Sequence, residues 1–236
     1  MVERLGRRHR FIWPDLPGYG LSAPVDGKTT IARVQTLLED AVLALGLKEL
    51  AIVGFSLGAY RALSMALNGR LRITDLVLVG GYAGLDPTDA EGMRQTAGFL
   101  RTLPDFQNPA VRQMVAERML TPESAKANPE AAQQVGRWLD LTTPWLLADE
   151  LESSADARDL SPHLGLLKSR VTLRVGARDL ATPARYSEEL AKRIKGARLQ
   201  VVPEAGHALL LEDPHRTLDA LDEALKAQVA TRREDG

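Results

Sequence analysis

The amino-acid sequence predicts an α/β protein with a mostly parallel sheet flanked by helices. Short apolar runs, each closed by glycine or proline, alternate with stretches whose apolar residues recur at helical spacing. Between two of these runs lies a long segment with helical patterns and no strand candidate. The chain has 236 residues, 44% of them hydrophobic and 26% charged, which is enough to bury one such core.

Five apolar runs are the predicted strands. Each is followed directly by a residue that commonly ends a strand, namely Pro14, Gly54, Gly80, Gly176 or Pro203. Because helical stretches separate these short runs, we expect most of the strands to pair in parallel. The runs are residues 11–13, 50–53, 76–79, 171–175 and 198–202.

Helices are predicted between the strands. Apolar residues at positions 31, 34, 37, 38, 41, 42 and 45 predict a helix over 31–45 that ends at Gly46. Residues 59–67 are strongly helix-forming. Residues 87–160 contain several helical patterns, with breaks at prolines 104, 109, 122, 129 and 144.

The segment 87–160 is expected to be a helical cap insertion. The core would then consist of residues 1–86 and 161–236, in two stretches of the chain. An insertion at the carboxyl end of a strand usually shapes a binding site, so we expect the cap to border the functional site. A purely structural helical flap is the alternative.

Composition excludes several classes of function. The 30 Lys and Arg residues balance 31 Asp and Glu residues, which leaves no electrostatic basis for binding nucleic acid or an anionic membrane. The absence of cysteine excludes disulfides, thiolate metal sites and a cysteine nucleophile. We expect no metal and no nucleotide cofactor, since no metal-ligand spacing or phosphate-binding glycine motif occurs. No apolar run approaches about 18 residues and no secretory signal is visible, so we expect a cytoplasmic protein.

The strongest chemical signal is the segment Gly54-Phe-Ser56-Leu-Gly58. It lies between a predicted strand and a predicted helix, the context of a nucleophile elbow. We expect both glycines to be required, because a Cβ at either would clash with the neighbouring strand and helix. The backbone N–H of Leu57, at the helix N-terminus, is expected to stabilise an oxyanion. A tight turn with an idle serine is the alternative.

A serine nucleophile needs a base that is oriented by an acid. Of the four histidines, we favour His207, because the loop after the last predicted strand lies at the same sheet edge as Ser56. The others are expected to be surface or turn residues: His9, His163 and His215.

The acid should also follow a strand. Asp179, four residues past the run 171–175, is favoured because Gly176 can reverse the chain before it. Asp86 is the alternative, although its place directly before Pro87 suits a helix N-cap. The order Ser, Asp, His along the chain is the order found in one fold class.

Four segments together resemble the α/β-hydrolase superfamily, in particular small cap-bearing esterases and lactonases of the 3-oxoadipate enol-lactonase type. The resemblance covers most of residues 9–225 and implies Ser56 as nucleophile, Asp179 as acid and His207 as base. A serine at the nucleophile position argues against haloalkane dehalogenases and epoxide hydrolases. The segments are Asp15-Leu-Pro-Gly-Tyr-Gly-Leu-Ser22, Gly54-Phe-Ser-Leu-Gly58, Val175-Gly-Ala-Arg-Asp179 followed by Ala181-Thr-Pro183, and Gly206-His207 followed by Leu211-Glu-Asp-Pro214.

The sequence departs from this family at its N-terminus. In the family a strand, a His-Gly loop that supplies a second oxyanion donor, and a helix precede the segment that starts here at Asp15. Only 14 residues precede Asp15, whereas a strand–helix–strand unit needs about 30. Residues 2–8 therefore read as the end of the helix, with the first strand and the His-Gly loop absent. We favour the interpretation that Met1 is an internal methionine or a misplaced start and that the natural protein is longer; a short chain that is compromised or repurposed is the alternative.

The expected function is that of a serine hydrolase that cleaves a small carboxylic ester or lactone through an acyl-enzyme on Ser56. Its pocket residues are expected to be Phe55, Tyr82, Trp138 and Trp145. A C–C bond or thioester hydrolase with the same triad is one alternative. A non-catalytic binding module or inactive fragment is the other, because the second oxyanion donor is missing. The expected partner is a small-molecule substrate, and the sequence does not indicate the oligomeric state.

Overall fold

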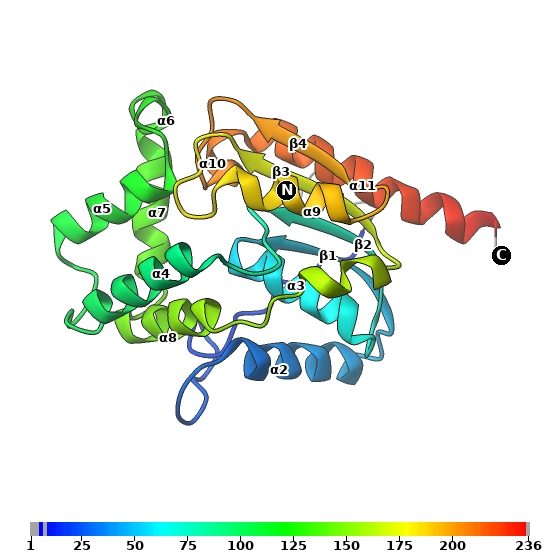
Figure 1. Ribbon diagram of the computed structural model, residues 1–236, viewed down its shortest axis with the longest axis horizontal. Helices are drawn as coiled ribbons and strands as arrows, with labels where there is room; N and C mark the ends of the chain where they lie inside the picture. Colours follow the sequence, from blue (N-terminus) through cyan, green and yellow to red (C-terminus); the bar gives the residue numbers. More distant parts are fainter. Residues whose placement is uncertain (1–4, 7–8, 235–236) are drawn as a thin grey trace.

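The computed structural model describes residues 5–6 and 9–234, with side chains up to residue 225. Its centre is one sheet of four strands in the order β1-β2-β3-β4, in which every neighbouring pair is parallel (Figure 1). The carboxyl ends of all four strands therefore meet at one edge of the sheet. The strands are β1 (Glu49–Phe55), β2 (Arg72–Val79), β3 (Arg170–Gly176) and β4 (Arg198–Val202).

Four of the five predicted strands are confirmed, and the prediction for residues 11–13 is wrong. That segment is not a strand, and within the described part of the chain no strand lies beside it to take up its backbone hydrogen bonds. Phe11 instead packs near Leu218 and Leu221 of α11 (Pro214–Glu234). As a consequence β1 pairs on one side only, with β2. The predicted helix end over residues 2–8 lies mostly outside the described residues.

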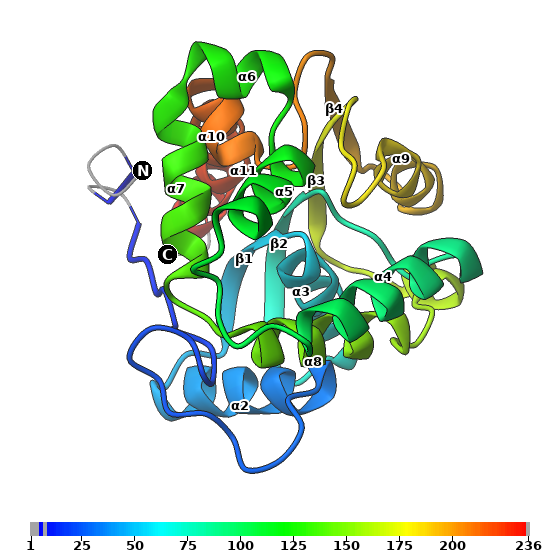
Figure 2. The same ribbon diagram turned by 90° about the vertical axis from the view of Figure 1, so that its left-hand side faces the viewer.

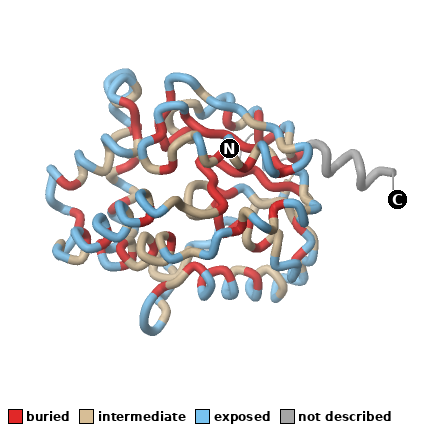
Figure 3. Tube along the Cα trace, viewed as in Figure 1, coloured by how far each residue is buried: buried red, intermediate tan, exposed pale blue. Residues whose placement is uncertain are grey.

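Both faces of the sheet are covered by helices, as the alternation of side chains along β2 shows. Leu76 and Leu78 point into the main core with residues of α2 (Ile31–Ala44), α3 (Leu57–Asn68) and α9 (Ala184–Arg193). Val77 points to the opposite face, where it packs with Leu221 of α11. The buried residues accordingly run through the strands, while the outer faces of the helices are exposed (Figure 3).

Five α-helices and a 3-10 helix separate β2 from β3. The five α-helices gather at one end of the molecule, beside the short helix α10 (Leu209–Glu212) (Figures 1 and 2). Each of the five begins with proline, whose missing N–H costs nothing in the first helical turn. Four of the predicted breaks are thus helix starts, and Pro104 lies in a connection. The helices are α4 (Pro87–Leu100), α5 (Pro109–Met119), α6 (Pro122–Ala127), α7 (Pro129–Leu139), α8 (Pro144–Ala155) and η1 (Ser161–Leu166).

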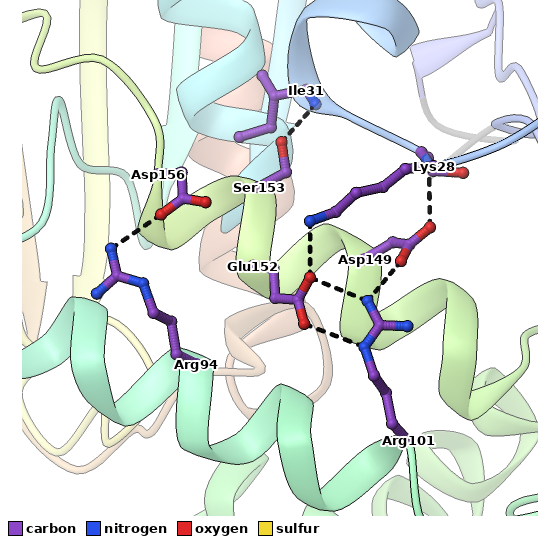
Figure 4. Close-up of polar contacts among 9 residues, drawn as sticks. Lys28, Ile31, Arg94, Arg101, Asp149, Glu152, Ser153 and Asp156 are labelled. Carbon is purple, nitrogen blue, oxygen red and sulfur yellow. Dashed lines mark hydrogen bonds and ion pairs between the residues drawn. The ribbon is translucent and has the colours of Figure 1, made fainter.

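Ion pairs tie α8 to the segment before α2 and to α4 (Figure 4). Arg101, directly after α4, lies 2.7 Å from Asp149 and 2.9 Å from Glu152. Lys28 reaches Glu152 from the other side at 2.7 Å. Backbone donors add to this, since the N–H of Ile31 donates to the Ser153 hydroxyl at 2.8 Å. The helix α8 is therefore fixed to the core at several points.

One of these contacts predicts a pH dependence of stability. Hydrogen bonds from Arg101 and then Lys28 lower the pKa of Glu152 from 4.5 to about 2. Because the folded-state pKa is the lower one, the carboxylate stabilises the fold above pH 4.5 and loses this contribution as pH falls towards about 2. We expect Glu152→Gln to be less stable than the wild type at neutral pH, with the difference vanishing in acid. Urea unfolding at a series of pH values measures this.

The matched control is Glu188→Gln, at an exposed glutamate inside α9 for which the described residues offer no ion pair. It should follow the wild-type curve at every pH. A constant difference between Glu152→Gln and the wild type from neutral to acid pH would contradict the prediction.

Candidate active site

Ser56 occupies a sharp turn between β1, which ends at Phe55, and α3, which starts at Leu57. Its backbone has φ 54° and ψ −121°, and it is the one non-glycine residue with positive φ in the described part of the chain. The N–H of Ser56 donates to the Val79 carbonyl at 2.8 Å, which fastens the turn to the end of β2. Such conformations are strained by about 1–3 kcal/mol and concentrate at functional sites.

The two glycines around Ser56 are not equivalent. A Cβ on Gly54 would lie 2.5 Å from the Gly58 carbonyl oxygen and 2.6 Å from Ala59 Cα, so this position requires glycine. A Cβ on Gly58 would meet nothing within 4 Å. The expectation that both glycines are sterically required is therefore wrong for Gly58, because the space beside it is open.

This difference predicts opposite outcomes for one chemical change. Gly54→Ala is expected to destabilise the fold by about 1–3 kcal/mol, the usual cost of overpacking. Gly58→Ala is expected to be neutral or stabilising by up to about 1 kcal/mol, because alanine is the better helix former. Chemical denaturation of both variants measures the two values. Equal destabilisation by the two substitutions would contradict this account of the turn.

Asp179 and His207 form a buried pair. The Nδ1 atom of His207 lies 2.8 Å from Asp179 Oδ2, and the two residues are 3% and 5% exposed, respectively. Asp179 follows β3 and His207 lies in the loop after β4, so both come from carboxyl ends of neighbouring strands. The other carboxylate oxygen, Oδ1, accepts the N–H groups of Ala181 at 2.9 Å and Thr182 at 2.7 Å. The carboxylate is thereby held in place from both sides.

Thr182 is a member of this cluster that sequence reasoning missed. Its hydroxyl lies 3.0 Å from the Gly80 carbonyl oxygen, 3.2 Å from Asp179 Oδ2 and 3.2 Å from His207 Nδ1. The signal in the sequence was its place three residues after Asp179, in the Ala-Thr-Pro segment. The hydroxyl joins the end of β2 to the Asp179–His207 pair.

Two neighbours of Ser56, one in the chain and one in the sheet, lie close to His207 of the Asp179–His207 pair. The ring of Phe55 lies 4.7 Å from the ring of His207, centroid to centroid. Gly80, which follows the Val79 acceptor of Ser56, has φ +59°, and a Cβ there would lie 3.3 Å from His207 Cε1. Among the described residues no hydrogen bond joins the Ser56 hydroxyl to His207. Ser56, Asp179 and His207 all lie at one edge of the sheet, and a hydrogen bond joins Asp179 to His207.

Leu57 is the first residue of α3. Its N–H therefore has no acceptor within the helix and lies at the positive end of the helix dipole. A developing negative charge beside Ser56 would meet this donor. The role of Leu57 as an oxyanion donor stays a prediction.

The alternative acid, Asp86, and the three other histidines lie outside the Asp179–His207 pair. Asp86 is the N-cap of α4, and its pKa is lowered because the Asp89 N–H and Arg185 donate to it. It takes no part in the Asp179–His207 contact. The other histidines also lie outside that contact; they are His9, His163 in η1, and His215 in α11.

The four predicted pocket residues have different surroundings. Tyr82 is 1% exposed, its ring stacks on Tyr60 at 5.4 Å, and its hydroxyl bonds to Ser154, so it is a packing residue of the core. Trp145 is 57% exposed and lies under the guanidinium of Arg101, 5.0 Å from the ring centroid. Among the described residues, neither side chain makes a ring contact or a hydrogen bond with His207.

Phe55 and Trp138 do lie close to the His207 loop. Phe55 contacts the ring of His207, as described above, and packs with Leu209. Trp138 of α7 belongs to an apolar cluster that includes Ala208, the residue after His207. These two aromatic side chains lie beside the His207 loop, and their role as pocket residues stays a prediction.

A buried ion pair lies on α3 beyond Ser56. Arg61 bonds to Glu150 of α8, and the two side chains are only 5% and 9% exposed. Among the residues that the structure describes, the Nε atom of Arg61 has no hydrogen-bond partner. Glu150 also acts on the phenol group of Tyr19. Burial, and then the negative charge of Glu150, raise the pKa of Tyr19 far above its ordinary value. The pair joins the helix that carries Ser56 at its start to the helical segment between β2 and β3.

In the part of the chain that the structure describes, no group of three His, Asp or Glu side chains is placed to hold a metal ion. No described helix combines the length and apolar character needed to cross a membrane.

The comparisons with known proteins give a consistent result. A family model of the alpha/beta hydrolase fold matches residues 1–214. Pimeloyl-acyl-carrier-protein methyl ester esterase from Neisseria meningitidis serogroup A is 33% identical over 216 residues, a match that covers 84% of this chain and 64% of that protein. The chain thus spans less than two thirds of the length of this relative.

Two solved structures resemble the chain. A thermophilic esterase from Thermogutta terrifontis has a TM-score of 0.84 at 26% identity, and the match covers 96% of this chain and 83% of that one. The enol-lactonase from Burkholderia xenovorans has a TM-score of 0.77 at 23% identity over 89% of this chain and 78% of its own. The second likeness shows a shared fold.

Proposed function

Because the chain belongs to the alpha/beta hydrolase fold family, we propose that it is a serine hydrolase of small carboxylic esters or lactones. One observation carries this proposal: a serine in a strained turn at the end of β1 shares a sheet edge with the buried Asp179–His207 pair. The names of the similar proteins, a methyl ester esterase, an esterase and an enol-lactonase, support the same substrate class.

The proposed mechanism starts with attack of the Ser56 hydroxyl oxygen on the acyl carbonyl carbon. His207 accepts the hydroxyl proton at Nε2, since its Nδ1 is engaged by Asp179. The Leu57 N–H donates to the oxyanion of the tetrahedral intermediate. The intermediate expels the alcohol, which takes the proton from His207 and leaves an acyl-enzyme on Ser56.

Water completes the reaction. His207 removes a proton from the attacking water and returns it to the Ser56 oxygen as the carboxylic acid leaves. In a lactone the acid and the alcohol remain in one molecule. Asp179 stays ionised throughout, orienting the ring of His207 and stabilising its protonated form.

The proposal includes the division of the chain into a core, residues 1–86 and 161–236, and a cap, residues 87–160. The cap would close the site from the side of α5–α7, with Phe55 and Trp138 as apolar walls for the acyl or alcohol part. The exposed position of Trp145 supports no such role.

A substrate panel tests the proposed function. Short-chain methyl esters, five- and six-membered lactones, thioesters and β-diketones are offered to the wild-type chain, and kcat/KM is measured for each. Highest turnover of an ester or a lactone supports the proposal, whereas preference for a thioester or a β-diketone would move it to another bond class. Saturable ester binding by a folded chain without any turnover would favour a binding module instead.

A further inference from the structure

The loop that carries His207 is held by a carboxylate that the mechanism does not use. Oε2 of Glu212, the last residue of α10, accepts the N–H of Gly206 at 2.7 Å. Its Oε1 accepts the N–H of Thr121 at 2.9 Å and the Thr121 hydroxyl at 3.2 Å. One side chain therefore joins the residue before His207 to the connection between α5 and α6.

A second contact holds the other side of His207. The N–H of Ala208 donates to the Met119 carbonyl at 2.8 Å. Ala208 is fully buried in an apolar cluster with Leu120 and Val135. Both peptide neighbours of His207 are thus bound to residues 119–121, one through Glu212 and one directly.

The backbone at Gly206 is closely packed against Glu212 and Thr121. A Cβ on Gly206 would lie 3.3 Å from Glu212 Oε2 and 3.3 Å from the Thr121 nitrogen. Residues 205–209 are all buried, although they form a loop and the start of a four-residue helix. Three contacts hold this backbone: the N–H of Arg178 donates to the Ala205 carbonyl at 3.0 Å, and Glu212 and Met119 hold residues 206 and 208.

The position of this backbone matters for the proposed reaction. Asp179 and Thr182 contact Nδ1 of His207 and the ring of Phe55 lies beside the imidazole, so the direction of Nε2 towards Ser56 depends also on where the backbone at 206–208 holds the ring. A displacement of about 1 Å in catalytic geometry can cost about a hundredfold in rate.

We propose that Glu212 is a positioning residue for His207, which makes the place of the base depend on the docking of residues 119–121. This inference rests on the proposed function. Movement of the α5–α6 connection away from the core would break the Glu212 and Met119 contacts together and release the His207 loop. The helical segment and the base are thus coupled through one carboxylate.

The test is Glu212→Gln, which preserves the side-chain shape but replaces one of the two acceptor oxygens by an NH₂ group. We expect kcat to fall by about ten- to a hundredfold while KM changes by less than about threefold. The matched control is Glu204→Gln, on the same loop, whose carboxylate is 79% exposed. Thr121→Val removes only the hydroxyl and keeps the N–H donor, so its loss in kcat should be the smaller one.

Two further readouts separate positioning from stability. Rates are measured well below the melting temperature of each variant, where a purely structural role would leave kcat unchanged. The proton on His207 Nδ1, bonded to Asp179, should give a low-field NMR resonance in the wild type and in Glu204→Gln, and a shifted or broadened one in Glu212→Gln. Unchanged kcat together with an unchanged resonance would overturn the inference.

The NMR readout does not need turnover, so the two proposals can fail separately. If the wild type hydrolyses no ester or lactone, the proposed function fails. The effect of Glu212→Gln on the His207 resonance then still decides whether the Glu212 side chain positions the His207 ring.

Discussion

Replacing Ser56 by alanine is expected to abolish reaction with a fluorophosphonate probe and to lower kcat for the preferred substrate by a factor on the order of 10⁶. The hydroxyl is the only atom group removed, and the strained turn stays closed by the N–H bond to Val79. Such a loss is large because the nucleophile and its base act as a unit. Intact mass of the purified chain after probe treatment shows one adduct on the wild type and none on the variant.

The matched control for this experiment is Ser64→Ala. Ser64 lies on the same helix, α3, and is half-buried, but it is not at the strand end. Its variant should carry the adduct as the wild type does. A folded wild-type chain that takes no adduct, or a Ser56→Ala chain that keeps one, would contradict the assignment of the nucleophile.

Breaking the buried ion pair is expected to have the largest effect on stability. Glu150→Leu leaves the Arg61 guanidinium, whose side chain is 5% exposed, buried without its partner. An uncompensated buried charge of this kind costs about 3–5 kcal/mol. The double variant Arg61→Met, Glu150→Leu should recover most of that loss, because apolar residues of similar volume replace a buried pair at little cost. The free energy of unfolding from urea denaturation measures both.

An exposed pair serves as the control. Glu189→Gln removes the partner of Arg193 on α9, where the two side chains are 46% and 51% exposed. Solvent screens that pair, so its loss should lie within the error of the measurement. A double variant as unstable as Glu150→Leu alone would show that the cost arises from packing and not from the unpaired charge.

Local sequence signals located most of the elements. Proline at the first helical position marked the starts of α5, α6, α7 and α8, because its effect on the backbone is confined to neighbouring residues. The strands β1 to β4 were found from short apolar runs for a similar reason. The Ser56 turn and the Asp179–His207 contact followed from the rule that parallel strands end at a common edge.

Errors arose where a distant partner decides the outcome. Residues 11–13 have strand composition, but a strand exists only beside another strand. The space around Gly58 depends on which elements pack there, and the pattern of the turn does not contain that information. The burial of the Tyr82 ring against Tyr60 and Tyr186 was likewise not visible in the sequence, and its role as a pocket residue stays a prediction.

Some long-range contacts gave no signal in the sequence. Arg61 and Glu150 are 89 positions apart, and no motif or spacing pointed to their pairing. Glu212 stood in a recognised segment, but its link to Thr121 spans 91 positions. Such pairs form only after the helical segment has docked on the core.

The conformation of Ser56 sets two kinds of selection against each other. Glycine adopts positive φ without a steric penalty, so Ser56→Gly should release part of the strain of about 1–3 kcal/mol. A library screened for heat resistance alone would therefore drift to glycine at this position and lose the hydroxyl. A library screened for hydrolysis would keep serine and accept the lower melting temperature. The residue found at position 56 after many rounds would reveal which property had been demanded of the protein.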